Sequence, residues 1–155
     1  MKVFADANFV TNMLLKLPFT AEVDRLLLEH ELNGSPPILV TRLVRQEVIN
    51  ALHRLVFESR ASAQGISVSL DSVKMAEVVF ISQLDAGRTF RAVTVDEAQV
   101  DELFFNLVHR HTAKHGFRTN DVLHVASALV LECDTFWSFD KKAKRLAELE
   151  GLRVN

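Results

Sequence analysis

The order of hydrophobic and polar residues along the chain predicts short buried strands that alternate with longer amphipathic helices. The run from Ile38 to Val40 is short and apolar throughout, as expected of a buried strand. Val73, Ala76, Val79 and Phe80 recur at helical spacing and would form one apolar stripe of a helix. Strands are therefore predicted at residues 2–5, 38–40, 91–95, 134–139 and 152–154, and helices at about 20–31, 42–60, 70–84 and 97–115, from 120 and from 141 onward. Caps for four of these helices are predicted at Thr20, Thr41, Asp96 and Asp140.

Strands that alternate with helices of about 10 to 20 residues pair in parallel through right-handed crossovers. We therefore expect an α/β fold, a three-layer α/β/α sandwich around a mainly parallel central sheet of about five strands. No repeat, linker or low-complexity segment divides the sequence, so residues 1–155 are expected to form one domain. In such sheets ligands bind beyond the carboxyl ends of the strands, and candidate chemistry should lie there.

Composition narrows the class of protein. Of 155 residues, 48% are hydrophobic, which is enough to build a core and argues against disorder. No apolar run approaches the roughly 18 residues of a membrane span, and the first residues lack the pattern of a signal peptide. The single cysteine, Cys133, excludes an intramolecular disulfide and suits the reducing cytoplasm. With 18 Lys and Arg against 20 Asp and Glu, binding to nucleic acid would depend on a local basic patch.

Three aspartates lie where such a sheet would place chemistry. Asp6 and Asp140 each follow a predicted strand, and Asp121 begins a predicted helix. Each also has an ordinary structural explanation, because aspartate is common in turns and caps and stabilises a helix N-terminus by roughly 0.3–1 kcal/mol. In that explanation Asn8 caps the helix that follows the first strand. The sequence around each residue is compatible with both explanations.

Glu47 is less easily explained by local structure. It lies four residues after Leu43 and four before Ala51, within the apolar stripe of the helix at 42–60. Burying a carboxylate is costly unless a cation meets it. Its side chain therefore reaches water at the edge of the stripe, pairs with a cation such as Arg54, or faces a functional site, and we favour the last.

A pocket shared by these four acids would need a divalent cation. Converging carboxylates repel one another and raise each other's pKa values, and an all-oxygen donor set suits Mg²⁺ or Mn²⁺. A water molecule activated by such a metal is a natural nucleophile for phosphodiester hydrolysis. The sequence contains no Ser-His-Asp motif, Gly-rich phosphate loop or cysteine nucleophile that favours a different chemistry.

The ordered set of acids resembles the PIN-domain nucleases, and among them the VapC-like toxins of bacterial and archaeal toxin–antitoxin pairs. The similarity covers nearly the whole chain. It rests on Phe4-Ala5-Asp6-Ala7-Asn8, on Glu47 in a helix after the second strand, on residues 118–128 with Asp121, and on Trp137-Ser138-Phe139-Asp140. The residues from 118 to 128, together with the order of the four acids, are its most specific part.

This resemblance implies a ribonuclease that depends on Mg²⁺ or Mn²⁺ and hydrolyses RNA by a metal-activated water, leaving a 5′-phosphate and a 3′-hydroxyl. The implied partners are an RNA substrate and a cognate antitoxin protein. The family often has threonine where this chain has Ser138, and both residues carry a hydroxyl. The implied catalytic and metal-binding residues are Asp6, Glu47, Asp121 and Asp140, with Asn8 and Ser138 orienting ligands or waters.

Contacts with RNA and with a second copy of the chain can also be assigned to residues. Arg118, Lys141 and Lys142 lie near two of the acids and are expected to attract the RNA backbone, unless they form solvated helix faces. Phe104 and Phe105 are adjacent and cannot both face one core, so one of them is expected at a homodimer interface.

Two other functions are compatible with the sequence. A phosphatase with Asp6 as nucleophile usually has a second aspartate two residues later, where this chain has Asn8. A PIN-like domain that serves as a non-catalytic scaffold or RNA-binding module is the other alternative, and the presence of all four acids argues against it.

Overall fold

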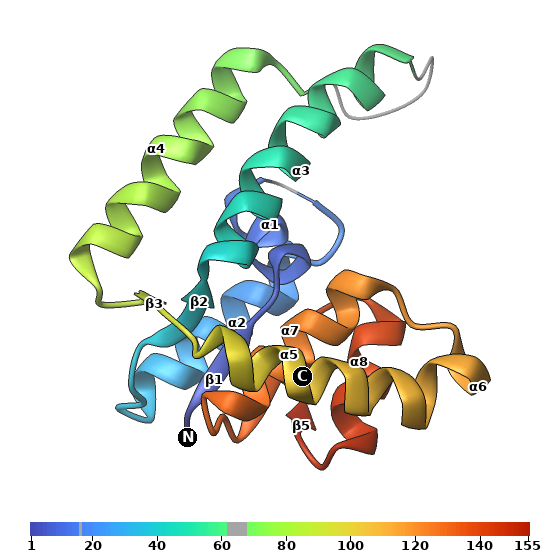
Figure 1. The fold of residues 1–155 in the computed structure, drawn as a ribbon. Helices are drawn as coiled ribbons and strands as arrows, with labels where there is room; N and C mark the ends of the chain where they lie inside the picture. The colour runs from blue at the N-terminus through green and yellow to red at the C-terminus, as the bar shows by residue number, and fades with distance from the viewer. Residues whose placement is uncertain (16, 62–67) are drawn as a thin grey trace.

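The computed structural model describes residues 1–15, 17–61 and 68–155, and its centre is a five-stranded parallel sheet (Figure 1). The strands are β1 (Val3–Ala5), β2 (Ile38–Thr41), β3 (Phe90–Val93), β4 (Thr135–Trp137) and β5 (Arg153–Val154). The helices are α1 (Ala7–Leu14), α2 (Thr20–Leu32), α3 (Arg42–Ala61), α4 (Leu70–Ala86), α5 (Glu97–Leu107), α6 (Ala113–His115), α7 (Thr119–Val130) and α8 (Lys141–Leu149), and a π-helical segment at Val108–Thr112 joins α5 to α6. None of the helices in the described residues is both long and apolar enough to cross a membrane.

The order of the strands in the sheet is β3-β2-β1-β4-β5. The chain moves outward from β1 to β2 and β3, returns to β4 on the other side of β1, and continues to β5. Right-handed crossovers then place α1 to α4 on one face of the sheet and α5 to α8 on the other. The packing agrees, because α1 contacts α2 and α3 while α7 contacts α5 and α8 (Figure 1). The predicted three-layer α/β sandwich is therefore confirmed, and its strand order reverses between β1 and β4.

β1 and β4 are adjacent strands in the middle of the sheet, and both are buried. All three residues of β1, Val3–Ala5, have no exposed surface. Phe4 of β1 stacks on Phe136 of β4 with ring centroids 5.8 Å apart. Helices cover both faces of a parallel sheet, which is why these strands are apolar runs without alternation. The carboxyl ends of β1 and β4 are consequently held side by side on a rigid core.

The structure contains a helix, α1, where the sequence pattern assigned none. The helix begins directly after β1, and Asp6 is its N-cap: the carboxylate accepts a hydrogen bond from the backbone N–H of Phe9 at 2.9 Å. The prediction that Asn8 caps this helix is wrong, since Asn8 lies inside it. The helix has only eight residues, too few for a repeated apolar stripe, and four consecutive residues are buried, namely Phe9, Val10, Thr11 and Asn12.

Two smaller predictions are also wrong. Thr20 is the first residue of α2 and not its N-cap, and its hydroxyl is bonded to the backbone of the preceding turn at Leu17. Val79 is 42% exposed, although Val73 and Phe80 on the same helix are buried. Successive positions differ by about 100° around a helix axis, so position 79 falls outside the buried stripe that contains position 80.

Candidate active site

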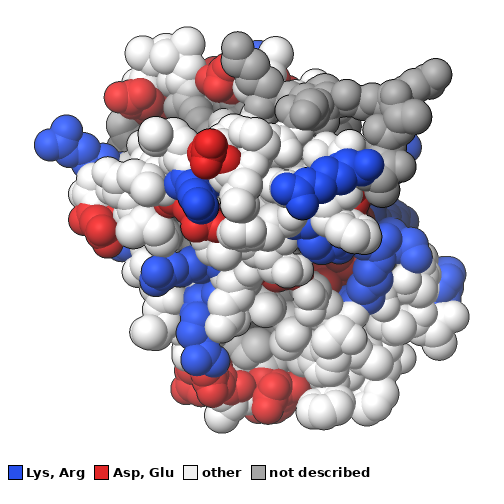
Figure 2. Space-filling model, turned by 90° about the horizontal axis from the view of Figure 1, so that it is seen from above, with Lys and Arg blue, Asp and Glu red and all other residues white. Residues whose placement is uncertain are grey.

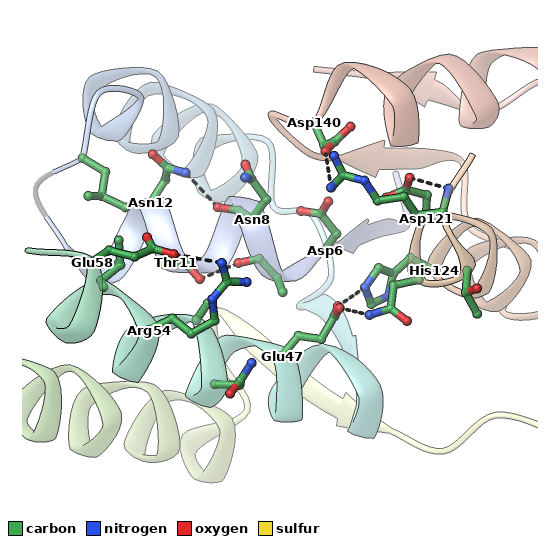
Figure 3. Close-up of a pocket in the computed structure, with 18 residues that line it drawn as sticks. Asp6, Asn8, Thr11, Asn12, Glu47, Arg54, Glu58, Asp121, His124 and Asp140 are labelled. Carbon is green, nitrogen blue, oxygen red and sulfur yellow. Dashed lines mark hydrogen bonds and ion pairs between the residues drawn. The ribbon is translucent and has the colours of Figure 1, made fainter. Parts of the chain in front are cut away.

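A pocket of about 680 Å³ opens at the carboxyl edge of the sheet, beside the point where the strand order reverses. Seen from above, Lys and Arg side chains border a recess in which acidic side chains are visible (Figure 2). The pocket is lined by all four acids singled out in the sequence, and their side chains point towards the same space (Figure 3). These are Asp6 after β1, Glu47 on α3, Asp121 in the first turn of α7, and Asp140 after β4.

Asp6 is the most deeply buried of the four acids, with 4% of its surface exposed. One carboxylate oxygen accepts the backbone N–H of Phe9, and the other accepts a hydrogen bond from the Ser138 hydroxyl at 2.5 Å. Burial raises the pKa of Asp6 to about 6, although His124 and the hydrogen bonds from Ser138 and Phe9 oppose the rise. Asp6 therefore carries a charge near neutral pH at a cost that a cation would remove.

Asp121 and Asp140 lie close enough to influence each other. Asp121 accepts the backbone N–H of Arg118 at 3.0 Å. Burial raises the pKa of Asp121, and the charge of Asp140 adds to the rise against the effect of the Arg118 hydrogen bond. Asp140 is the N-cap of α8, where it accepts the backbone N–H groups of Lys142 and Ala143 at 2.7 and 3.3 Å. Its second oxygen lies 3.8 Å from the guanidinium of Arg118.

The structural explanation of the three aspartates is confirmed, and it does not exclude the functional one, which stays a prediction. Asp6 caps α1, Asp121 lies in the first turn of α7, and Asp140 caps α8, so three helix N-termini meet at the pocket. The partial positive charge of a helix N-terminus favours a carboxylate there. A carboxylate has about four lone-pair positions, and capping uses only some of them. The caps thus fix the carboxylates and leave lone pairs free.

Ser138 ties the ends of the two central strands together. Its hydroxyl donates to Asp6 and accepts the backbone N–H of Asp140 at 2.9 Å, while its own N–H donates to the side chain of Asn155 at 2.9 Å. Ser138 has no exposed surface. Asn8 lines the pocket from α1. The geometry of Ser138 is what an orienting residue requires, and the roles of both residues stay predictions.

The partner of Glu47 is a histidine and not the arginine considered from the sequence. Glu47 is hydrogen-bonded to Nε2 of His124 through one oxygen and to Nδ2 of Asn120 through the other. Arg54 pairs instead with Glu58 at 2.8 Å (Figure 3). Burial acts to raise the pKa of Glu47, but the hydrogen bond and charge of His124, together with Asn120, outweigh it and hold that pKa below its ordinary value.

Sequence reasoning missed His124 and Asn120 as site residues, and both line the pocket. A signal for His124 exists, because it lies three residues after Asp121 in an otherwise apolar helix, where an imidazole needs a polar partner. Nothing comparable marks Asn120, which is exposed.

The three basic residues expected to bind substrate have different surroundings. Arg118 lines the pocket beside Asp140. Lys142 donates through Nζ to the backbone carbonyl of Gly116 at 2.7 Å and so anchors the segment before α7. Lys141 is exposed at the start of α8, and neither lysine is among the residues that line the pocket. Contact of these residues with RNA stays a prediction.

The donor chemistry of the pocket fits a divalent cation. As they are placed, no three Asp, Glu, His or Cys side chains of the described residues are close enough together to hold a metal ion. Asp6, Glu47, Asp121 and Asp140 nevertheless offer only carboxylate oxygens, the donors that Mg²⁺ and Mn²⁺ prefer. The raised pKa values of Asp6 and Asp121 arise from burial and from repulsion by Asp140, and both effects are relieved by a positive ion.

The chain resembles known proteins over nearly its full length. Among solved structures, VapC20 from Mycobacterium tuberculosis, a sarcin–ricin loop cleaving toxin, has a TM-score of 0.63 at 14% identity, over 93% of this chain and 94% of VapC20. FitAcB from Neisseria gonorrhoeae has a TM-score of 0.48 at 17% identity, over 98% of this chain and 95% of its own. At this identity VapC20 shows a shared fold alone. No curated protein matches the sequence. The family model of the PIN domain matches residues 3–149, and the chain therefore belongs to the PIN domain family.

Proposed function

We propose that this chain is a divalent-metal-dependent endoribonuclease and the toxin of a toxin–antitoxin pair. The observation that carries the proposal is the convergence of Asp6, Glu47, Asp121 and Asp140, from four separate parts of the chain, on one pocket. Membership of the PIN domain family and the fold shared with the VapC20 toxin support the same function. No feature of the pocket favours the phosphatase alternative, because the position two residues after Asp6 is the amide Asn8.

The roles of the residues follow from their contacts. When bound, Mg²⁺ or Mn²⁺ supplies the Lewis acidity that polarises a phosphodiester and activates a water molecule for attack. Ser138 holds one oxygen of Asp6 in place by donating to it. Asp6 must be ionised to act as a ligand, and its pKa of about 6 leaves it mostly ionised at pH 7. The residues that would hold the cation are Asp6, Glu47, Asp121 and Asp140.

Two guanidinium groups supply the positive charge that RNA requires. Arg54 on α3 and Arg118 before α7 line the pocket that contains the acids, and their side chains are 69% and 72% exposed. An exposed guanidinium can turn to a phosphate and bind it with two hydrogen bonds. These contacts position the RNA backbone, while Lys141 and Lys142 extend the positive surface along α8.

A second copy of the chain would bind outside the pocket, through an exposed aromatic side chain. Phe104 is half-buried against the core, whereas Phe105 is 57% exposed. Phe105 is therefore the member of this pair that is available for contact with a second copy of the chain. A cognate antitoxin is the further partner that a toxin of this kind needs.

The nuclease proposal is tested with purified protein and Mn²⁺ or Mg²⁺. It should cleave members of an RNA panel that includes a sarcin–ricin loop fragment, the target named for VapC20, and leave a 5′-phosphate and a 3′-hydroxyl. Asp6→Asn and Asp121→Asn should abolish cleavage while the circular dichroism spectrum stays unchanged. Asp96→Asn is the matched control, since Asp96 caps α5 outside the pocket and its variant should cut like the wild type.

Three outcomes would contradict this function. Cleavage that persists in Asp121→Asn would remove the pocket from the mechanism. A wild-type protein that binds neither metal in calorimetry would refute the metal assignment. Metal-bound protein that binds RNA but cuts no member of the panel would favour the non-catalytic alternative.

The toxin role is tested by expression in a bacterial host. Induction should arrest growth, and Asp6→Asn should relieve the arrest at the same protein level. Co-expression of a small DNA-binding protein encoded in the neighbouring reading frame should restore growth. Normal growth on expression of the wild-type chain would contradict the toxin role without affecting the nuclease assay.

A further inference from the structure

His124 is a buried polar side chain on the apolar face of α7. Its side chain is 5% exposed, and it lies about one helical turn after Asp121 on the same helix. The neighbouring positions Val122, Val125 and Ala128 are buried and apolar. An imidazole in such surroundings lowers the stability of the fold unless its nitrogens are hydrogen-bonded. The position of His124 therefore demands a specific partner.

That partner is Glu47, which lies 77 positions earlier in the sequence. Nε2 of His124 faces Oε2 of Glu47, and an ionised carboxylate can only accept, so Nε2 carries the hydrogen. Nδ1 is buried and has no hydrogen-bond partner in the described part of the chain. The ring of Phe4 packs beside the imidazole at a centroid distance of 6.2 Å. Among the described residues, Glu47 is thus the polar contact that orients this ring.

Asn120 holds the other oxygen of the same carboxylate. Its Nδ2 donates to Oε1 of Glu47. Asn120 and His124 are four residues apart on α7, so their side chains lie on one face of the helix and both bind the carboxylate of Glu47. Figure 3 shows the side chains of His124 and Glu47 facing each other. Glu47 itself belongs to α3, in the opposite helical layer. The contact therefore joins the two layers across the pocket.

We propose that His124 is a positioning residue that holds Glu47 in the pocket that Asp6 and Asp121 also line, and so determines how tightly this pocket binds a divalent cation. The inference rests on the proposed function, because it assigns a role in the same metal site. Without this contact, the side chain of Glu47, which is 26% exposed, would keep only the hydrogen bond from the exposed Asn120 and could turn to solvent more easily. Each Glu47 oxygen keeps a further lone pair, so the hydrogen bonds from His124 and Asn120 do not prevent Glu47 from binding a cation.

The expected loss of metal affinity can be estimated from comparable contacts in other metal-binding proteins. Residues that orient a metal ligand typically change metal affinity by about 10–100-fold when they are removed. The cause is preorganisation: a long, flexible glutamate otherwise loses its rotamer freedom each time a cation binds. We expect His124 to act through Glu47 alone, which makes the effect conditional on the presence of that carboxylate.

The test measures Mn²⁺ affinity by titration calorimetry on the full chain, so that RNA cleavage is not needed as a readout. His124→Leu removes the donor at similar volume and should weaken binding by about 10–100-fold. His124→Gln keeps an N–H donor of similar reach and should recover most of the loss. In a Glu47→Ala background, His124→Leu should change affinity by less than about twofold, because the contact is already gone.

A matched control separates positioning from general damage to the fold. His30 is also buried, and its Nε2 is hydrogen-bonded to the carbonyl of Pro36 at 2.8 Å, away from the pocket. His30→Leu should leave Mn²⁺ affinity unchanged. If His124→Leu does not fold, His124→Asn takes its place, since the asparagine amide is too short to reach Glu47.

The outcomes distinguish this inference from the proposed function. Wild-type affinity in His124→Leu, equal affinities in the Leu and Gln variants, or the same loss with and without Glu47 would each overturn the positioning role. A wild-type protein that binds Mn²⁺ and shows the expected coupling but cuts no RNA would contradict the nuclease and leave the positioning role standing. Absence of Mn²⁺ binding by the wild type would overturn both.

Discussion

Replacing Asp6 by asparagine should stabilise the metal-free protein at neutral pH, although the residue belongs to the proposed active site. Asp6 is 4% exposed, and its carboxylate is ionised at pH 7 without a compensating cation in the metal-free protein. Asparagine has nearly the same shape and no charge. It can still accept the backbone N–H of Phe9 and is as good an N-cap as aspartate.

The size of the effect follows from the pKa of Asp6. Burial raises this pKa from 3.8 to about 6, and one pKa unit corresponds to 1.36 kcal/mol, so ionised Asp6 costs the folded state about 3 kcal/mol. The hydrogen bond with Ser138 must rearrange in the variant, which costs about 1 kcal/mol. Asp6→Asn should therefore raise the free energy of unfolding at pH 7 by about 2 kcal/mol.

The sign of the pH dependence follows from the same values. The folded pKa is higher than the unfolded one, so the folded state binds the proton more tightly. The stability that Asp6 contributes is fully present below pH 3.8 and is lost as the pH rises to about 6. The gap between variant and wild type should accordingly widen between about pH 4 and pH 7, because the variant lacks this titration.

Urea unfolding in the presence of EDTA measures this difference in unfolding free energy between Asp6→Asn and the wild type. Unfolding can be followed by the fluorescence of Trp137, the single tryptophan of the chain, which is 3% exposed. Trp137 also reports on the site, because its carbonyl accepts the backbone N–H of Asp6 at 3.1 Å. Asp96→Asn replaces an exposed N-cap and should change stability by less than about 0.5 kcal/mol. A gap that does not widen with pH, or an Asp6→Asn variant less stable than the wild type at pH 7, would refute the reasoning.

Three further predictions concern the site and the core. Mn²⁺ at 100 times its dissociation constant should raise the wild-type unfolding free energy by about 2.7 kcal/mol, and an equal rise in Asp121→Asn would contradict the metal site. Ser138→Ala should lower the free energy of unfolding, measured in urea, by about 2–3 kcal/mol, because the buried hydroxyl donates to Asp6 and accepts a backbone N–H. Ser138→Thr keeps a hydroxyl and should lose less stability. Equal losses in the two variants would argue against these hydrogen bonds. Leu52→Ala, at a fully buried position of α3, should lower the free energy of unfolding by about 2–5 kcal/mol. Leu32→Ala, at an exposed position, should lower it by less than about 0.5 kcal/mol. Similar losses in the two variants would show that α3 is not packed as described.

Most of the fold could be predicted because the signals are local. Short apolar runs mark the central strands, since both faces of the sheet are covered, and in a long helix such as α4 the buried residues Val73, Ala76 and Phe80 recur at helical spacing. The helix α1 could not be found in this way, because it is short and buried on several sides. The π-helical turn at Val108–Thr112 was likewise invisible within the helix predicted at 97–115, since one wide turn hardly disturbs the periodicity.

The acids of the candidate site could be selected from the sequence, but the hydrogen bonds that hold them in place could not. Asp6 and Asp140 were identified because they follow strands, and the carboxyl ends of neighbouring parallel strands meet at one edge. The hydroxyl of Ser138, which joins these two residues, carries no local mark that distinguishes it from any serine at a strand end.

By itself, the sequence determined the five strands, the longer helices between them, the α/β class and the four acids that the structure brings to one pocket. Only the tertiary structure decided that Glu47 is held by His124 and Asn120, while the arginine two turns along its own helix pairs with Glu58. The physical reason is that periodicity reports which face of a helix is buried. It does not report which distant helix meets that face, and the contact across the pocket depends on how α3 and α7 pack on opposite faces of the sheet.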